Sequence, residues 1–479
     1  MEFKTRAMAL AVTLAVTGML AGAPAALAAG DEDLKELREQ VRQLREQYEK
    51  RIESLERRLQ QAEQSAGKAE AVADKAQLAA DQASVQASSR PVGEGAMNPG
   101  ISLILNGTYG NLSRDPAAYR INGFNPTGGE VAPPNRGLSL GESELVVSAN
   151  IDPNFRGTLI AKLGADDKIS VEEATIQTLG LSDGLSIKAG RFLSGVGYQN
   201  QIHPHAWDFV DAPLANKVFL GNQLIDDGVQ LKWVAPTELY LDLGMELGRG
   251  RKFPAGPDGG RNKNGFGSGT LFAHVGGDIG VSTAWQLGLS HLQTSPQGRT
   301  YTDPDSTGTT VTNSFSGRSR LWVADGVLKW SPKGNATSTS FKLQGEYFRR
   351  NEEGQLTYDS TAASRGAQTG ALTSRQSGWY GQGVYQFMPQ WRAGYRYDKL
   401  DSGTLGLALV DSGALSAADF PLLGKYNPRR HTLMADWGAS EFSRVRLQLA
   451  RDYSRPNAPD NQVLLQYIVS MGAHGAHKF

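Results

Sequence analysis

Most of the chain beyond residue 100 consists of short segments in which apolar and polar residues alternate. In 239–247 every odd-numbered residue is Leu or Met, and in 341–347 the odd-numbered residues are Phe, Leu, Gly and Tyr. Side chains of a β-strand point alternately to its two faces. Each segment therefore predicts a strand with one apolar and one polar face.

Sixteen segments of this kind can be marked, and the connections between them are alternately short and long. The connections at 152–154, 182–184 and 388–390 have three residues each, whereas those at 194–226 and 351–375 are far longer. An even strand number with short turns at one end and long loops at the other is typical of outer-membrane barrels. We expect an all-β transmembrane barrel of about 16 antiparallel strands over 101–479. The predicted strands are 101–110, 141–152, 155–164, 170–179, 185–193, 227–235, 237–247, 267–276, 281–293, 319–331, 339–350, 376–388, 390–400, 430–438, 443–454 and 462–479.

The last predicted strand ends on a terminal aromatic residue. Val463, Leu465 and Tyr467 share the parity of Phe479, and Gln466 lies on the opposite face. An alternating final strand that ends on Phe resembles the C-terminal signature of outer-membrane proteins. Aromatic residues beside the short turns, where a membrane interface is expected, support this location. They are Trp233, Trp330, Tyr385, Phe387 and Trp391.

The first 28 residues have the layout of a cleaved secretory signal. Lys4 and Arg6 precede an apolar stretch, and small residues follow up to Ala28. The apolar stretch is shorter than the ~20 residues that a spanning helix needs, so an uncleaved anchor is the weaker alternative. The chain contains no cysteine, which excludes disulfides and thiolate metal sites. We expect export through the inner membrane.

Residues 29–90 carry apolar side chains at steps of three and four, as in a coiled coil. The second half of this stretch offers only alanine at the seam, so it would associate weakly. A single solvated helix is the alternative. Residues 91–100 are rich in Pro and Gly and are interpreted as a linker. This gives four regions: signal 1–28, helix 29–90, linker 91–100 and barrel 101–479, with the helix in the periplasm of a Gram-negative cell.

The side chains on the expected inner face carry charges of both signs. Charges on a lipid-facing surface would be costly, so their position on one face of the strands favours a water-filled lumen on that face. The alternative is the solvated face of a soluble sheet. A mixed lining implies weak ion preference at most. The basic residues are Arg156, Lys162, Lys188, Lys232, Lys342, Arg392, Arg396, Arg444 and Arg446. The acidic residues are Glu144, Glu173, Asp242, Glu246, Glu346, Asp398 and Asp436.

The third long connection, 194–226, is the expected constriction of such a lumen. Its candidate pore residues are His203, His205, Asp208, Asp211 and Lys217. The two histidines flank a proline and could ligate a borderline metal, with Asp208 or Asp211 near in sequence. This spacing is far from a specific zinc motif, and a pair that lines the pore or is merely structural remains the alternative.

Enzyme motifs are missing from the sequence. We find no Gly-x-Ser-x-Gly elbow, no His-Glu-x-x-His helix and no phosphate-cradling glycine loop. Lys and Arg together number 49 and so do Asp and Glu, so no overall charge attracts nucleic acid. We expect neither enzymatic activity nor a cofactor.

Around the third long connection the sequence carries, in this order, Gly190-Arg191-Phe192, Gly197, Asp208-Phe209, Pro213-Leu214-Ala215-Asn216 and Gly228-Val229-Gln230-Leu231. These residues in this order resemble the phosphate-selective porin O/P family. That resemblance implies a coiled-coil prefix, a sixteen-stranded barrel and basic residues beside the constriction loop. The loop here instead carries several aspartates with Lys217.

A second similarity lies in 97–105, Met-Asn-Pro-Gly-Ile-Ser-Leu-Ile-Leu. This segment is similar to proteobacterial outer-membrane proteins labelled zinc-linked receptors. Energy-coupled receptors have about twenty-two strands around a globular plug. This chain is too short for that architecture and carries a predicted coiled coil in place of the plug.

The leading hypothesis is a porin, a passive channel for small hydrophilic solutes or ions. We expect it to be homotrimeric and embedded in outer-membrane lipid. One alternative is a selective barrel for the uptake of zinc or a metal chelate, centred on His203 and His205. Another is a structural envelope protein, tethered through a helix that could reach roughly 80 Å at ~1.5 Å per residue.

Overall fold

The computed structural model describes residues 99–124, 131–165, 167–256 and 264–472, with residues 39, 42, 46, 49–51, 53 and 54. The chain divides into two units, 1–96 and 97–479, and the described positions of the first unit are all helical. The predicted signal 1–28, most of the predicted coiled coil and linker, and Phe479 lie outside the described residues. None of the described helices is both long and apolar enough to cross a membrane.

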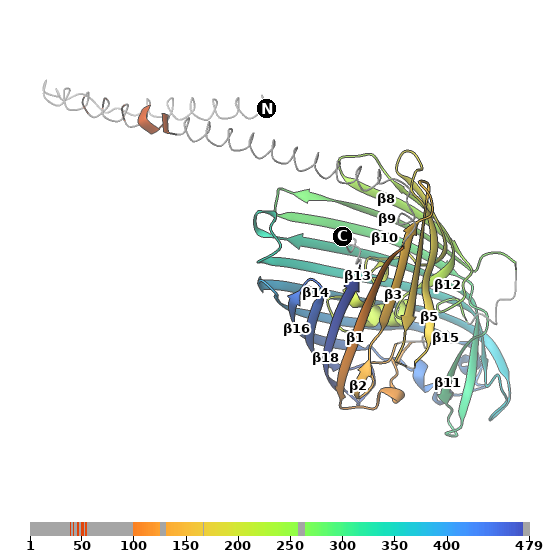
Figure 1. Cartoon of the computed structure of the whole chain (residues 1–479). Coiled ribbons are helices and arrows are strands. Elements are labelled where there is room, and N and C mark those ends of the chain that lie inside the picture. Colours follow the sequence, from red (N-terminus) through yellow and green to blue (C-terminus); the bar gives the residue numbers. More distant parts are fainter. Residues whose placement is uncertain are drawn as a thin grey trace, which may run out of the picture. The chain divides into compact units, whose positions relative to one another are not determined.

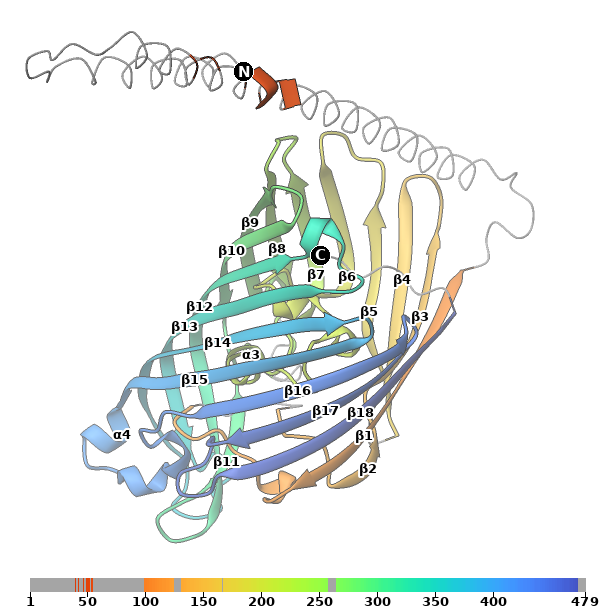
Figure 2. The same cartoon turned by 90° about the vertical axis from the view of Figure 1, so that its left-hand side faces the viewer.

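Within the described residues, sixteen antiparallel strands form a closed ring (Figures 1 and 2). The last strand closes the ring by pairing with the first, from Ser102 opposite Gly472 to Leu112 opposite Gln462. The expected barrel of about 16 strands is confirmed. The ring strands are β1 Gly100–Leu112, β3 Ser143–Asn150, β4 Phe155–Leu163, β5 Ile169–Thr178, β6 Leu185–Leu193, β7 Ile225–Val234, β8 Tyr240–Gly248, β9 Ser268–Ile279, β10 Thr283–Thr294, β12 Thr310–Trp330, β13 Ser340–Tyr358, β14 Gln368–Met388, β15 Trp391–Leu407, β16 Arg429–Ser440, β17 Ser443–Asp452 and β18 Asp460–Gly472.

Shorter elements lie in the connections between the ring strands. Two short strands pair with the ring: β2 Gly137–Leu140 lies on β1, and β11 Arg299–Pro304 lies on β12. The α-helices of the barrel unit are α3 Leu214–Leu220 and α4 Ala408–Asp411. The 3-10 turns are η1 Pro116–Ala118, η2 Gln199–Gln201, η3 Pro204–Ala206, η5 Pro332–Gly334, η6 Ala417–Asp419 and η7 Pro421–Leu423.

The two faces of the ring differ as the alternation requires. On β13, Leu343 and Tyr347 are exposed to the outside, whereas the Glu346 side chain between them is buried inside the barrel. On β18, Leu465 is exposed and its neighbour Gln466 is buried. All five aromatics predicted beside short turns are also exposed. The outer surface is apolar, and the inner surface carries the polar and charged groups.

Strands β12 to β15 run further than the sequence predicts. β13 reaches Tyr358 rather than residue 350, and β14 begins at Gln368 rather than 376. The extension is held by an inward apolar cluster from the ends of these strands and from the connection between β15 and β16. Glu352 and Glu353 interrupt the apolar alternation at this point, so the extension carries no simple period-2 signal.

The connection between β6 and β7 folds into the ring instead of standing outside it (Figure 2). All seven residues of α3 are buried. Phe219 stacks on Phe348 of β13, with ring centroids 5.7 Å apart, and meets Phe124 edge to face at 6.0 Å. An apolar cluster therefore joins the first and third long connections to the inner wall.

We predict that Phe219→Ala loosens this connection without opening the ring. Removal of a fully buried phenylalanine costs about 3–5 kcal/mol, and here the loss falls on the docked state of α3. Hydrogen exchange at the amides of Leu214–Leu220 should become much faster, while exchange in the ring strands stays slow. Phe442→Ala removes an exposed ring and should leave α3 unchanged. Equal protection of α3 in both variants would contradict the packing role of Phe219.

Candidate functional site

The segment from residue 194 to 224 crosses the barrel interior, and its first turn is held by acidic side chains of the wall. Glu246 of β8 accepts a hydrogen bond from the Gly195 N–H at 2.7 Å. Glu346 of β13 accepts one from the Tyr198 N–H at 2.6 Å. Gly197 has φ +66°, and a Cβ there would lie 2.5 Å from Glu346 Oε1. Glycine is needed at 197 because only a residue without a side chain lets the backbone approach this carboxylate.

Further along the segment, the acidic side chains belong to the loop and pair with basic side chains of the wall. Asp208 lies 3.0 Å from Lys342 Nζ of β13 and 3.2 Å from an Arg392 guanidinium nitrogen of β15. Burial alone would raise the pKa of Asp208, but the charges of Lys342 and Arg392 outweigh it and lower the pKa below its ordinary value. Arg392 also forms a bidentate pair with Asp436 of β16. Asp208 is therefore ionised between two fixed cations.

Asp211 is the most densely paired carboxylate of the segment. It contacts Arg430 of β16 at 2.5 Å, Arg396 of β15 at 3.1 Å and Lys217 of α3 at 3.0 Å. Burial would raise the pKa of Asp211, but the charges of Arg430, Lys217 and Arg396 hold it well below its ordinary value. In addition, Asp398 of β15 accepts a hydrogen bond from the Leu214 N–H at 2.8 Å. The start of α3 is thus fixed to β15 and β16.

Two arginines of β17 bind backbone carbonyls of the same segment. Arg444 donates to the His205 carbonyl at 2.6 Å, and Arg446 donates to the Trp207 carbonyl at 2.8 Å. Hydrogen bonds with a charged donor are roughly twice as strong as neutral ones. Residues 205–211 are therefore held by β13, β15, β16 and β17 together.

The two histidines face the opposite wall. His203 Nδ1 lies 3.6 Å from Glu144 Oε2 of β3 and 3.4 Å from Glu172 Oε2 of β5, while its Nε2 lies 3.5 Å from Glu173 Oε1. His205 Nδ1 lies 2.8 Å from Glu144 Oε1. Burial would lower the pKa of His203, but the carboxylates of Glu172, Glu173 and Glu144 outweigh it and raise the pKa well above its ordinary value.

A β-bulge brings two consecutive glutamates to this cluster. Ile160 of β4 pairs with Glu173, but the next residue, Ala161, pairs with Val171, so Glu172 has no partner across the ladder. A bulge of one residue re-aims the side chain next to it. Glu172 and Glu173 consequently both reach His203, although neighbours in a regular strand would face opposite sides.

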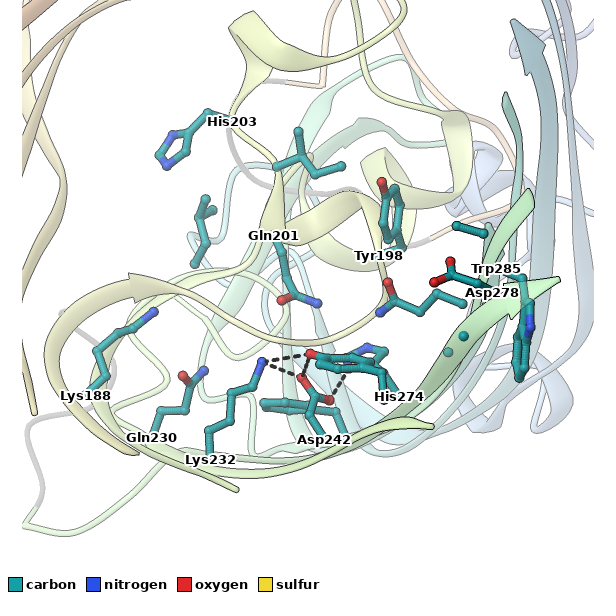
Figure 3. A pocket seen from close by; sticks show the side chains of 18 of the residues that line it. Lys188, Tyr198, Gln201, His203, Gln230, Lys232, Asp242, His274, Asp278 and Trp285 are labelled. Carbon is teal, nitrogen blue, oxygen red and sulfur yellow. Dashed lines mark hydrogen bonds and ion pairs between the residues drawn. The ribbon is translucent and has the colours of Figure 1, made fainter. Parts of the chain in front are cut away.

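Two cavities adjoin the segment. The first, of about 680 Å³, is lined by His203, Lys188 and Lys232 among others (Figure 3). The second, of about 840 Å³, is lined by His205 and Asp208 together with basic wall residues. Tyr198 and Ile202 line both cavities, so the turn that carries them lies between the two spaces.

Several of the predicted lumen residues form local ion pairs. Lys162 pairs with Glu142 at 2.8 Å, and Lys232 pairs with Asp242. Asp242 also lies 2.7 Å from His274 Nδ1, and these contacts are drawn as dashed lines in Figure 3. Arg156 is exposed beside a turn. The structure brings the predicted constriction residues together with Lys342, Arg392, Arg396, Arg444 and Arg446, but it places Asp208 and Asp211 with these arginines and not with the histidines.

Glu172 and Arg430 are not among the residues predicted from the sequence. Glu172 follows Val171 and precedes Glu173, so it breaks the alternation, and two adjacent acidic residues in a strand are the available signal of the bulge. Arg430 lies at the start of β16, inside the predicted strand 430–438, but no local pattern indicates its partner. Its contact with Asp211 spans 219 positions of the chain.

No family model matches the sequence. An "Uncharacterized protein" of Aquifex aeolicus (strain VF5) is 30% identical over 425 residues, which cover 81% of each chain. Solved structures similar to this chain include in-vitro folded OmpT, an outer membrane protein of Vibrio cholerae (TM-score 0.46, 9% identity, 79% of this chain and 99% of that one). They also include the outer membrane channel DcaP of Acinetobacter baumannii (0.46, 10%, 79% and 99%) and an anion-selective porin from Comamonas acidovorans (0.46, 11%, 78% and 99%).

We predict that Asp211→Asn detaches residues 205–220 from β15 and β16. Three buried cations would lose their shared carboxylate, and loss of one partner of a buried ion pair costs roughly 3–5 kcal/mol. Proteolysis or hydrogen exchange of this segment should accelerate at pH 7. Asp183→Asn, in an exposed turn, is the matched control.

The ion pairs of Asp211 also determine how the protection of this segment depends on pH. The folded pKa of Asp211 is depressed, so its contribution is complete above the unfolded value of about 3.9 and is lost as pH falls through the folded pKa. The wild-type segment should therefore remain protected at pH 5, and protection should decline only at more acidic pH. Equal protection of Asp211→Asn and wild type at pH 7 would show that the carboxylate does not hold the segment.

Proposed function

The chain belongs to the same family as the Aquifex aeolicus protein, and we propose that it is an outer-membrane porin, a water-filled channel for passive diffusion of small hydrophilic solutes or ions. The observation that carries the proposal is the inverted surface of a closed ring. Apolar side chains such as Leu343 and Leu465 are exposed outside, while ionisable groups such as Glu346 and Arg446 lie inside. This distribution suits lipid around the barrel and water within it.

In this proposal the segment 194–226 is the constriction. Charged contacts on both walls hold it across the interior. The cavities of about 680 and 840 Å³ beside it provide polar space on two sides of the turn at Tyr198 and Ile202. A constriction fixed in this way would sort solutes mainly by size.

The charges of the two cavities support a weak ion preference at most. The second cavity is lined by Lys329, Lys342, Arg392 and Arg444 against Asp208, Asp436 and Glu441. The first is lined by Lys188 and Lys232 against Glu173, Asp242 and Asp278. Lys and Arg differ in number from Asp and Glu by one in each cavity, in opposite directions, and histidines line both. We therefore propose a general porin rather than a phosphate-specific one, since the basic groups come from the wall and three of them, Lys232, Lys342 and Arg392, are already paired with carboxylates.

We also propose a homotrimer, on the basis of the coiled-coil pattern in 29–90. The mass of the complex, determined by light scattering in detergent with the detergent contribution subtracted, tests this assembly. A monomer at micromolar concentration would contradict it.

Single-channel conductance in planar bilayers tests the channel itself. We expect steady openings for the wild type, with a reversal potential near zero in a KCl gradient. Asp208→Asn removes the carboxylate that neutralises Lys342 and Arg392, so the reversal potential should shift toward anion preference by a few-fold in permeability ratio. Asp183→Asn should not shift it. Absence of conductance in a folded wild-type protein would contradict the porin proposal.

The lipid-facing surface is tested by two neighbouring positions of β10. Leu287 is exposed outside, and Gln286 lines the first cavity. Leu287→Arg should destabilise the folded barrel in lipid vesicles by up to about 2–4 kcal/mol, because arginine is costly on a lipid face. Gln286→Arg places the same charge in the lumen and should cost much less. Urea unfolding in vesicles measures both, and equal stabilities would contradict the membrane orientation.

A further inference from the structure

The cluster of His203 with three glutamates has the arrangement of a metal site. Glu144 Oε2, Glu172 Oε2 and His203 Nδ1 all lie within 4.8 Å of one another. In a tetrahedral zinc site, with ligands at about 2.0–2.1 Å, neighbouring ligand atoms are about 3.4 Å apart. The distances from His203 Nδ1 to the two carboxylate oxygens, 3.6 and 3.4 Å, are close to this value.

The same three atoms lack hydrogen bonds. Glu144 Oε2, Glu172 Oε2 and His203 Nδ1 are buried, and none of them has a hydrogen-bond partner within the described part of the chain. The Glu144 and Glu172 side chains are only 0% and 2% exposed. Buried carboxylate oxygens need a compensating cation or donor, and here the three atoms lie within 4.8 Å of one another.

The surroundings match those of a metal ligand. His203 Nε2 lies 3.5 Å from Glu173 Oε1, so the ring can present Nδ1 to a cation while a carboxylate faces its other nitrogen. Glu144 is held through its second oxygen by His205 Nδ1 at 2.8 Å. Partners of this kind orient ligands and tune their basicity in known metal sites.

A cation could reach the cluster from the lumen. His203 and Glu173 line the first cavity, and Figure 3 shows the His203 ring at the edge of that space. We propose that Glu144, Glu172 and His203 bind a divalent transition-metal cation of the zinc type. Because Glu144 belongs to β3, Glu172 to β5 and His203 to the crossing segment, the cation joins that segment to the wall opposite Arg396 and Arg430.

Zinc binding to the full-length protein in detergent, stripped of metal with a chelator and dialysed, tests the proposal. Titration calorimetry should give one zinc ion per chain. Glu172→Gln, which keeps the side-chain shape, and His203→Ala should each weaken zinc binding by at least about tenfold. His431→Ala removes an exposed histidine that contacts Tyr395 on the outer face, and it should bind zinc as the wild type does.

Two further measurements separate a built site from incidental binding. Cobalt(II) should give visible absorption bands of a four-coordinate ion in the wild type but not in His203→Ala, and calcium should bind far more weakly than zinc because one ligand is an imidazole. Zinc should also slow hydrogen exchange at residues 199–205. Heat-modifiable migration of each variant in SDS gels checks that the barrel is folded.

The proposal is overturned if the folded wild type binds no zinc, which would leave a proton on His203 as the balance for the carboxylates. It is also overturned if Glu172→Gln binds zinc as tightly as the wild type. Zinc binding without slower exchange would remove the joining role. The conductance of metal-free protein tests the channel separately, so failure of either proposal leaves the other standing.

Discussion

The pairing of β18 with β1 is the constraint on which the rest of the structure depends. It turns an open sheet into a ring with no free edge, and every backbone group of a ring strand can then find a partner in a neighbour. Closure also separates the two parities of side chains into an outside and an inside. The apolar outer surface and the charged inner surface are consequences of this one geometry, since each strand has only those two faces.

A ring of this width has an interior that the wall side chains do not fill, and residues 194–224 occupy part of it. Wall acids accept the backbone N–H groups of Gly195, Tyr198 and Gln199, and wall arginines bind the loop acids and carbonyls of residues 205–211. The buried charges of Asp208 and Asp211 are thus compensated by groups from other elements. The segment is held by its contacts with the wall, since its own helix, α3, has only seven residues.

The sequence predicts the strands well because period-2 alternation is a local signal. The strand number, the inner faces and the position of the third long connection all follow from it. The partners of that connection do not, because Arg430 and Asp211 are brought together only by the curvature of the ring. The bulge in β5 was also missed, since a parity argument assigns Glu173 to the inner face and Glu172 to the outer one.

The two sides of the crossing segment form different charge pairs with the wall. Toward β13 to β17 its carboxylates meet lysine and arginine, and these pairs are complete within the protein. Toward β3 and β5 its histidines meet three glutamates, and three buried ligand atoms there lack hydrogen bonds. The charge pairs toward β13 to β17 can fix that side of the segment without any additional ion. On the other side the carboxylates outnumber the imidazoles, so a bound cation would complete the same pattern of compensation.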